Sequence, residues 1–256
     1  MAWDDRIDFI QAGVIPAQPS GNLTLENGKE FRGKRIVQTF ADAEQIVQED
    51  PRARWQHFLG WEVETDAACF DVDSATLMDF LPTEYGEVQF VYVLPLAPNR
   101  ALIEFTVIGA SLWQEEHYAK GLSCYLSDRY EGVSYRIQHR ELGRIPMSVL
   151  PGLHNKAKGA LSYLGTPAGA VKASTGYAFL RIQESVEKLI ASNDGPEKRS
   201  GFWLICDATL LRLMSTNFLM SDYLFGLFKH WGVSTVLDFL NEKTRWWETL
   251  ATRTRS

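Results

Sequence analysis

The fold of this chain is decided by two apolar runs within QFVYVLPLAPNRALIEFTVI, residues 89–108. The first run ends near residue 96, a proline and an asparagine follow within residues 97–100, and the second run begins at Ala101. Runs rich in β-branched and aromatic residues, joined by a short turn, are typical of antiparallel strands. The stretch therefore predicts an antiparallel strand pair.

Glu104 lies in the middle of the second run. Side chains alternate between the two faces of a strand, so one face would carry Ala101, Ile103, Phe105 and Val107, and the other Leu102, Glu104, Thr106 and Ile108. A carboxylate among apolar neighbours is costly to bury ionised, which would raise its pKa and make it a candidate proton donor. Alternatively, Glu104 lies at the end of a strand and pairs with a basic residue, which explains the pattern equally well.

Outward from this pair, strands are expected first and helices later. Further strands are expected within residues 23–31 around an Asn27-Gly28 turn, at 35–37, from 56 onward, at 133–140 and at 160–164. Helices are expected at 111–127, where Ser111 and Gln114 have the spacing of a capping box, at 177–190 and beyond 199, with helix or loop at 42–51. This order predicts an α/β to α+β fold with a mixed or antiparallel sheet and a helical C-terminal region.

Composition argues against several classes of function. The net charge is −6, and no basic stripe is interleaved with aromatics, so the electrostatic footprint of nucleic-acid binding is lacking. Three widely spaced cysteines favour a reducing, cytoplasmic compartment. Neither a signal peptide nor a spanning helix is expected. Asp71, Asp73 and Asp79 are interpreted as a solvated loop, and no metal is expected.

A second candidate site is the small-residue loop at residues 165–176, between a predicted strand and a predicted helix. A helix N-terminus offers free N–H groups to a phosphate, and small residues let the backbone approach a ligand closely. The loop is neither a G-x-G-x-x-G turn nor a Walker loop. By itself it can equally be a simple turn.

Taken together, six motifs in order over residues 56–183 resemble the lycopene cyclase family. They are QHFLGWEV at 56–63, FD at 70–71 with LMDF at 77–80, FVYVLPL at 90–96, ALIE at 101–104, GRIPM at 143–147, and GT at 165–166 with VKASTGYAF at 171–179. Each motif alone is modest, but the ordered set is specific.

The resemblance implies a fold like that of FAD-dependent hydroxylase-type flavoproteins. It implies a lycopene β-cyclase of carotenoid biosynthesis, an isomerase that acts as an intramolecular lyase. Its reaction would be an acid-initiated, non-redox cyclisation of the ψ-ends of lycopene, or of a related acyclic carotenoid, to β-rings. Reduced FAD would be the cofactor and NADPH its electron source.

The resemblance also assigns roles to individual positions. Glu104 matches the first acid of the family's E-[ED]-T motif and would be the catalytic acid. The substrate side would hold Asp79, Phe80, Tyr92, Pro146 and Met147. The flavin side would hold Gly165, Thr166, Gly169, Ser174, Thr175, Gly176 and Tyr177.

The sequence departs from the family pattern at two points. Phe105 stands where the family usually has a second acid, and no G-x-G-x-x-G occurs, which predicts that the nucleotide-binding βαβ unit is missing. The expected division is a remnant of the nucleotide-binding domain at 1–50, a substrate-binding sheet domain at 51–150, and a flavin-side loop with helices at 151–256. A complementary flavin-binding chain would then be a partner.

Two alternatives remain open. The chain is either an inactive or split-enzyme fragment that binds a carotenoid or lipid, or another isoprenoid-acting flavoprotein such as a prenyl reductase or hydroxylase. For a cyclase, the membrane-dissolved substrate predicts peripheral contact with the cytoplasmic membrane. The aromatic-rich stretch 202–228 is the candidate surface, and a helical cap on the core is the other interpretation.

Overall fold

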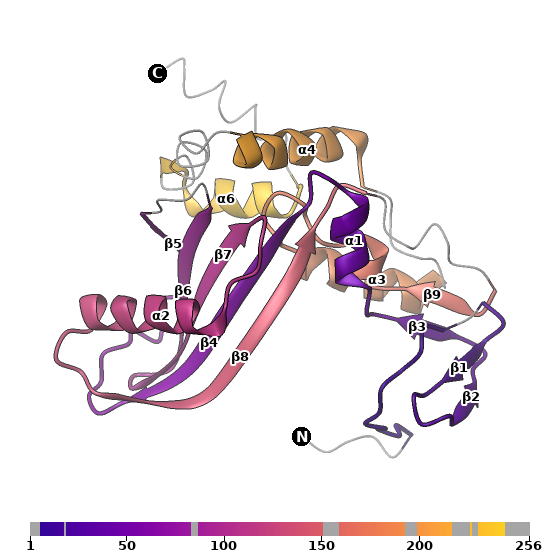
Figure 1. Ribbon diagram of the computed structural model, residues 1–256, viewed down its shortest axis with the longest axis horizontal. Helices are drawn as coiled ribbons and strands as arrows, with labels where there is room; N and C mark the ends of the chain where they lie inside the picture. Colours follow the sequence, from indigo (N-terminus) through magenta and orange to yellow (C-terminus); the bar gives the residue numbers. More distant parts are fainter. Residues whose placement is uncertain are drawn as a thin grey trace. The chain divides into compact units, whose positions relative to one another are not determined.

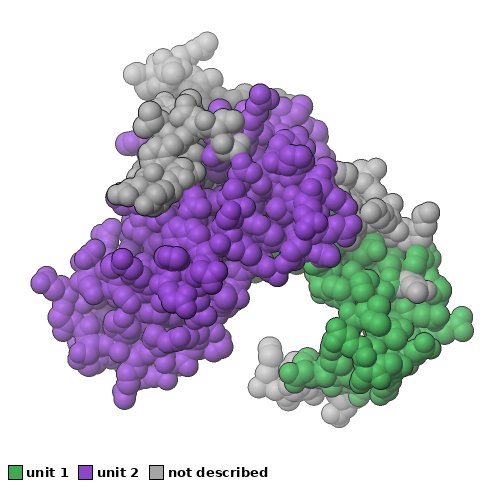
Figure 2. All heavy atoms as spheres, in the orientation of Figure 1, with its two compact units in different colours: residues 1–41, 151–171, 178–198 green, residues 42–150, 172–177, 199–256 purple. Residues whose placement is uncertain are grey.

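A computed structural model describes residues 6–17, 19–82, 87–150, 159–192, 199–216, 226 and 230–243 (Figure 1). The chain forms two compact units, which Figure 2 colours separately. Unit 1 comprises residues 1–41, 151–171 and 178–198, and unit 2 comprises residues 42–150, 172–177 and 199–256. These units are defined by compactness, whereas the three-part division expected from the sequence is functional and stays a prediction.

Unit 1 begins with the predicted hairpin. Strands β1 (Asn22–Thr24) and β2 (Glu30–Arg32) pair antiparallel, with Leu23 opposite Phe31. Gly28 has φ 83° in the connecting turn, and its N–H donates to the Leu25 carbonyl at 2.9 Å. A positive φ costs glycine no steric strain, which explains the Asn-Gly pair at this turn.

The rest of unit 1 is a parallel strand pair and a helix. β3 (Ile36–Gln38) pairs parallel with β9 (Leu161–Tyr163), although more than 120 residues separate the two strands in sequence. The short 3₁₀ helix η2 (Thr166–Ala168) follows β9, and α3 (Phe179–Ser192) comes later in the chain. The guanidinium of Arg35 donates to the carbonyl of Leu189 in α3 at 3.3 Å. The predicted strand at 160–164 and helix at 177–190 are therefore confirmed.

Unit 2 is built on a five-stranded antiparallel sheet with the strand order β5-β6-β7-β4-β8. The strands are β4 (Arg54–Thr65), β5 (Thr76–Leu81), β6 (Val88–Ala97), β7 (Arg100–Gly109) and β8 (Tyr135–Met147). The predicted pair at residues 89–108 is the β6–β7 hairpin, which confirms that prediction. β7 is the central strand of the sheet, so both of its edges are paired.

The two faces of this sheet differ in their covering. On the helix-covered face, α2 (Glu115–Arg129) packs against the sheet, and the buried side chains of β7 there are Ala101, Ile103, Phe105 and Val107. Tyr118, Leu122, Tyr125 and Leu126 of α2 complete this core. The opposite face, here called the Glu104 face, carries Tyr92 of β6, Glu104 and Thr106 of β7, and Gly60 of β4. The predicted alternation along β7 is thus confirmed.

The predicted capping box at Ser111 is wrong. α2 begins at Glu115, and its N-cap Gln114 makes no side-chain capping hydrogen bond. Tertiary contacts position residues 111–114 instead. The backbone N–H of Trp113 donates to the Tyr118 hydroxyl at 3.2 Å, and its indole N–H donates to Glu87 at 3.1 Å. Spacing alone could not reveal these contacts.

Helices α1, α4 and α6 also belong to unit 2. The segment expected as helix or loop contains α1 (Ala43–Glu49), whose N-cap Asp42 accepts from the Gln45 N–H at 3.0 Å. α4 (Gly201–Thr216) and α6 (Val233–Leu240) are the expected C-terminal helices. Leu211 and Met214 of α4 pack on one end of the Glu104 face, beside Phe90, Ile108 and Met147.

Within the described part of the chain, no helix is long and apolar enough to cross a membrane. Searched over the same residues, the structure brings together no three His, Cys, Asp or Glu side chains that could hold a metal ion.

Candidate active site

Glu104 lies in the middle of the central strand. It pairs in register with Tyr92 on β6 and with Gly60 on β4, and its side chain is mostly buried. Burial raises the pKa of Glu104 to about 6, the Thr106 hydrogen bond opposes this, and the charge of Glu141 adds to it. A carboxyl group whose pKa is raised toward neutral pH keeps a protonated fraction there and is suited to donate a proton. The strand-end alternative for Glu104 does not apply.

Thr106 orients the Glu104 carboxyl group. Its hydroxyl donates to Oε1 of Glu104 at 2.8 Å, and Thr106 itself is fully buried. With Oε1 held as the acceptor, the acidic proton belongs on Oε2. The hydrogen bond therefore selects the oxygen that can donate.

Aromatic rings cover the Glu104 face beside the acid. The Phe80 and Phe90 rings meet edge to face with centroids 5.7 Å apart, and Phe90 meets Tyr92 in the same way at 5.2 Å. Burial, followed by the charge of Glu104, raises the pKa of Tyr92, so the phenol stays neutral. Ring faces attract cations, and apolar walls exclude water. The arrangement can protonate a hydrocarbon and hold the resulting cation.

The predicted substrate residues divide between the two faces. Phe80, Tyr92 and Met147 lie on the Glu104 face, and Met147 is fully buried there. Asp79 lies on the helix-covered face, where it accepts from the Tyr125 hydroxyl at 3.0 Å and pairs with Arg129 at 2.8 Å. Pro146 also lies on that face, opposite Trp55. Adjacent strand residues must point to opposite sides, so the structure does not bring Asp79 and Pro146 together with Glu104.

A tight loop, residues 172–177, adjoins the Gln56 end of the Glu104 face. Gly176 has φ 72°, and its N–H donates to the Lys172 carbonyl at 2.8 Å. A Cβ at this position would overlap the side-chain carbonyl of Gln56, so only glycine fits. The loop backbone therefore approaches β4 more closely than a side chain would allow.

Two buried polar atoms at this place lack a partner within the described structure. They are Oε1 of Gln56 and Oγ1 of Thr175. Buried polar groups are almost always hydrogen-bonded, so a pair of unsatisfied atoms beside a close backbone approach is typical of a ligand position. Gln56 offers an acceptor and Thr175 a donor or acceptor. The sequence analysis included Gln56 in a motif but gave it no role.

Behind the loop lies a buried group of charges, here called the Asp207 cluster: Lys172, Ser174, Arg199, Asp207 and Glu242. The Lys172 ammonium lies 2.7 Å from Oδ1 of Asp207, and the Ser174 hydroxyl donates to the same oxygen at 2.6 Å. Arg199 pairs with both Asp207 and Glu242. Lys172 also lies over the rings of Trp203 and Phe239, at 4.6 and 4.7 Å.

The Asp207 cluster joins the loop to helices α4 and α6. Burial alone would raise the pKa of Asp207, but the charges of Lys172 and Arg199, with their hydrogen bonds, hold it below its ordinary value. The Ser174 hydroxyl, predicted on the flavin side, is committed to this cluster. Sequence reasoning missed the cluster because its members are far apart in the chain. The one signal was Asp207 inside the apolar stretch of α4.

The other predicted flavin-side residues are placed as follows. Thr175, Gly176 and Tyr177 belong to the loop in unit 2, where the Tyr177 carbonyl accepts from the Lys172 N–H at 2.7 Å. Gly165, Thr166 and Gly169 belong to unit 1, around η2. The additional Pro167 lies in the first turn of η2, where a missing N–H costs nothing.

Solved structures define the class of fold. HpxO from Klebsiella pneumoniae, complexed with FAD, is similar at 12% identity and a TM-score of 0.52, with 91% of this chain and 67% of that chain covered. A geranylgeranyl bacteriochlorophyll reductase-like protein from Thermoplasma acidophilum is similar at 14% identity and a TM-score of 0.46, with 78% and 52% covered. The chain thus spans about half the length of the latter. The fold is that of flavoprotein hydroxylases, as expected.

The family follows from the sequence itself. The family described as lycopene cyclase protein matches residues 2–201, and the chain belongs to it. No protein with a curated description matches the chain. The predicted family and fold class are both confirmed.

Proposed function

We propose that this chain forms the substrate side of a FAD-dependent lycopene β-cyclase. The observation that carries the proposal is Glu104, a mostly buried acid with a pKa raised to about 6, on a face lined by Phe80, Phe90 and Tyr92. Membership of the lycopene cyclase family supports the same substrate class. The proposed substrate is lycopene or a related acyclic carotenoid.

The reaction needs one proton and no net electron transfer. The O–H bond of Glu104 breaks as a C–H bond forms on the terminal double bond of the ψ-end. The neighbouring double bond attacks the resulting cation, and a ring C–C bond forms. A proton is then lost from the ring as its double bond forms. Aromatic rings stabilise the cation, and the buried acid supplies the proton without competition from water.

Gln56, Thr175 and Gly176 fit the edge of a flavin ring. The Gln56 carbonyl would accept from a ring N–H and the Thr175 hydroxyl would bond a ring carbonyl or nitrogen, while Gly176 lets the loop backbone pack closely against Gln56. When bound, reduced FAD would supply an electron-rich ring that stabilises positive charge, and NADPH would be the source of its electrons. On the family motif we also propose Tyr177 of unit 2 as a flavin contact, and the roles of Gly165, Thr166 and Gly169 of unit 1 stay predictions of that motif.

Peripheral contact with the cytoplasmic membrane is also part of the proposal, because the substrate dissolves in lipid. Ile205 of α4 is 69% exposed and Val233 of α6 is 72% exposed, and Phe202 and Leu237 of the same helices are exposed as well. Exposed apolar side chains on helices are suited to the membrane interface. Residues 217–225 and 227–228 of the predicted surface stretch lie outside the described residues.

The test is expression in a lycopene-accumulating bacterium, with pigments separated by chromatography. The chain is expressed alone and together with a flavin-binding chain that contains a G-x-G-x-x-G motif. The matched control is Glu116→Gln, because Glu116 is exposed on α2. The proposal is supported by a cyclic carotene that disappears in Glu104→Gln and persists in this control.

Other pigment patterns would contradict it. Purified chain with bound carotenoid, but without flavin or cyclisation, favours the binding-fragment alternative. A carotenoid with reduced double bonds favours a prenyl-reductase-type reaction. Unchanged lycopene in both expression formats, with folded protein present, rejects the cyclase.

A further inference from the structure

Glu141 lies on the Glu104 face, in the same row across the sheet. Gly60 of β4 pairs with Glu104 on one side and with Glu141 of β8 on the other. Directly paired residues point to the same face, so the two carboxylates flank Gly60. Two strand spacings separate their Cα atoms by about 10 Å.

Gly60 places no side chain between the two carboxylates. A Cβ at residue 60 would lie 3.3 Å from Cδ1 of Leu102 and 3.8 Å from Cβ of Glu141. Any larger side chain would therefore stand between the acids. With glycine, only the strand backbone lies between the positions of Glu104 and Glu141 in this row.

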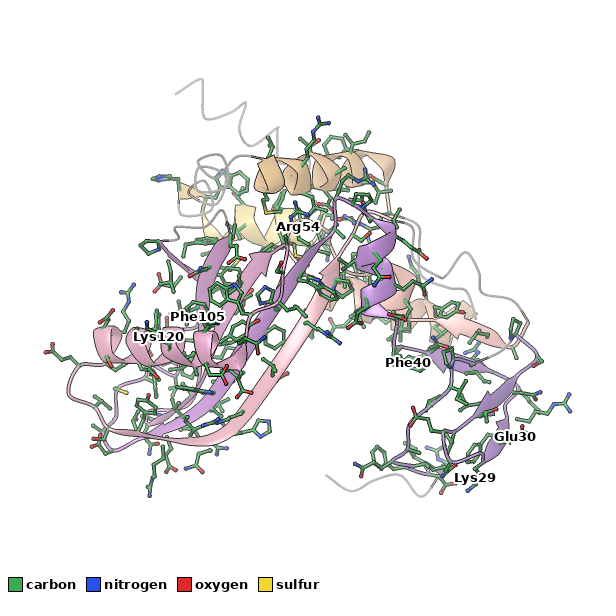
Figure 3. All side chains as sticks on the ribbon, viewed as in Figure 1. Lys29, Glu30, Phe40, Arg54, Phe105 and Lys120 are labelled. Carbon is green, nitrogen blue, oxygen red and sulfur yellow. The ribbon has the colours of Figure 1, made fainter. Side chains whose placement is uncertain are left out.

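Position 105 lies on the face opposite Glu104. An acidic residue at this position could therefore not lie beside Glu104. Its side chain is 3% exposed on the helix-covered face, where its ring packs against Trp113 with centroids 6.1 Å apart (Figure 3). A Cβ built on Gly121 of α2 would come within 2.5 Å of the Phe105 ring. The second position of the E-F-T motif thus serves the packing of α2, and a second acid has to come from another strand.

Glu104 and Glu141 have different surroundings. Glu104 is mostly buried, and burial raises its pKa to about 6, whereas Glu141 is exposed on the edge strand. Two carboxyl groups in different environments, one buried and one exposed, can divide the roles of acid and base between them.

We propose that Glu141 is the second carboxylate of this site and accepts the proton that is lost after ring closure. This inference rests on the proposed function. In the step, a ring C–H bond breaks, its electron pair forms the ring double bond, and the proton passes to a Glu141 oxygen. Glu141 then releases the proton to water, and water reprotonates Glu104. The cycle therefore closes without a net change in protons or electrons.

Other titratable groups share this face and belong in any account of its pH dependence. In β4, β6, β7 and β8 they are Arg54, Glu62, Glu64, Tyr92, Arg100, Arg136 and His139. Glu62 is paired with Arg100. Glu141 is the acid that pairs with Gly60, and Gly60 in turn pairs with Glu104.

The experiment compares Glu141→Gln, Glu141→Asp and the control Glu116→Gln in whichever expression format gives cyclisation. We expect Glu141→Gln to lower the rate about 100-fold, which is the lower end of what loss of an acid or base costs. Its products should include ring double-bond isomers, because proton loss is no longer directed. The fall in rate at high pH should move to lower pH, because Glu104 loses a negative neighbour. Glu141→Asp should recover part of the rate.

Two results would overturn the proposal: a Glu141→Gln rate equal to that of the control, or a lower rate with unchanged products and pH profile. If the wild-type chain cyclises nothing, the proposed function has failed, and carboxyl-carbon NMR of the folded chain decides about Glu141 separately. A Glu104 titration that stays in place in Glu141→Gln then contradicts the inferred pair.

Discussion

Asp207 and Glu104 are two carboxylates of unit 2 that behave in opposite ways. Asp207 is fully buried between Lys172 and Arg199, whereas Glu104 has a hydroxyl, Thr106, and another acid, Glu141, as its neighbours. Burial opposes ionisation at both. Only at Asp207 do cations offset it, so the pKa of Asp207 is lowered while that of Glu104 is raised to about 6. A paired buried acid supports structure, and an unpaired one is available for chemistry.

The largest expected effect is the loss of activity in Glu104→Gln. Removal of the proton donor should reduce cyclisation on the order of 100-fold or more. The free energy of unfolding should stay equal or rise slightly, because glutamine fills the same space without a charge to desolvate. Pigment chromatography and urea unfolding measure the two quantities. A large loss of stability would place Glu104 in the same class as Asp207 and break the comparison.

Asp207→Ala should have the opposite profile. Removal of one partner leaves Lys172 and Arg199 buried with unbalanced charge, which typically costs about 3–5 kcal/mol. The free energy of unfolding in urea measures this loss. The exposed Asp128→Ala on α2 is the control and should change stability by less than about 0.5 kcal/mol. An Asp207→Ala chain as stable as the control would show that the cluster does not hold the loop to α4 and α6.

The next largest effect is expected in the pH dependence of stability, which should have opposite directions for Glu104 and Asp207. For Glu104 the folded pKa of about 6 lies above the ordinary 4.5, so the folded state binds more protons between these values. Stability should therefore fall as pH rises through that window, by roughly 1–2 kcal/mol. For Asp207 the lowered pKa predicts stability that is present above its ordinary 3.8 and lost as pH falls below it.

Urea unfolding at several pH values tests both directions, with Glu104→Gln as the control for the upper window. The decrease between pH 4.5 and 6 should be absent in that variant. If stability still decreases over this pH range in Glu104→Gln, a different group causes the effect.

The smallest effect is expected for Thr106→Val. Loss of the 2.8 Å hydrogen bond removes an interaction that lowers the pKa of Glu104, so that pKa should rise. The change should correspond to about 0.5–1.5 kcal/mol. Carboxyl-carbon NMR measures it, and Thr106→Ser, which keeps a hydroxyl, should retain much of the wild-type titration. A pKa that falls in Thr106→Val would mean that Thr106 accepts the bond instead of donating it.

Local pattern was enough to predict much of the fold. The apolar runs at 89–108 predicted the β6–β7 hairpin, and alternation along β7 separated Glu104 from Phe105 correctly. The Asn27-Gly28 pair predicted the hairpin turn of unit 1. These features depend on neighbours in sequence, and such neighbours are visible in a single chain.

The same reasoning failed where distant residues compete with local ones. Ser111 and Gln114 have capping-box spacing, but Tyr118 and Glu87 hold Trp113 outside the helix. Asp79 and Phe80 were grouped as substrate residues, yet strand geometry sends their side chains to opposite faces. The family motif alone contained no information about which face carries the aromatic rings.

The sequence by itself determined the family, the strand that carries the acid and the alternation that places Glu104 on one face of the sheet. Only the tertiary structure decided what surrounds that acid. Gly60 and Glu141 reach it from other strands, and Lys172 meets Asp207 across 35 residues of sequence. The physical reason is that a pKa depends on burial and on charges within a few ångströms, and the fold, rather than the order of residues, sets those distances.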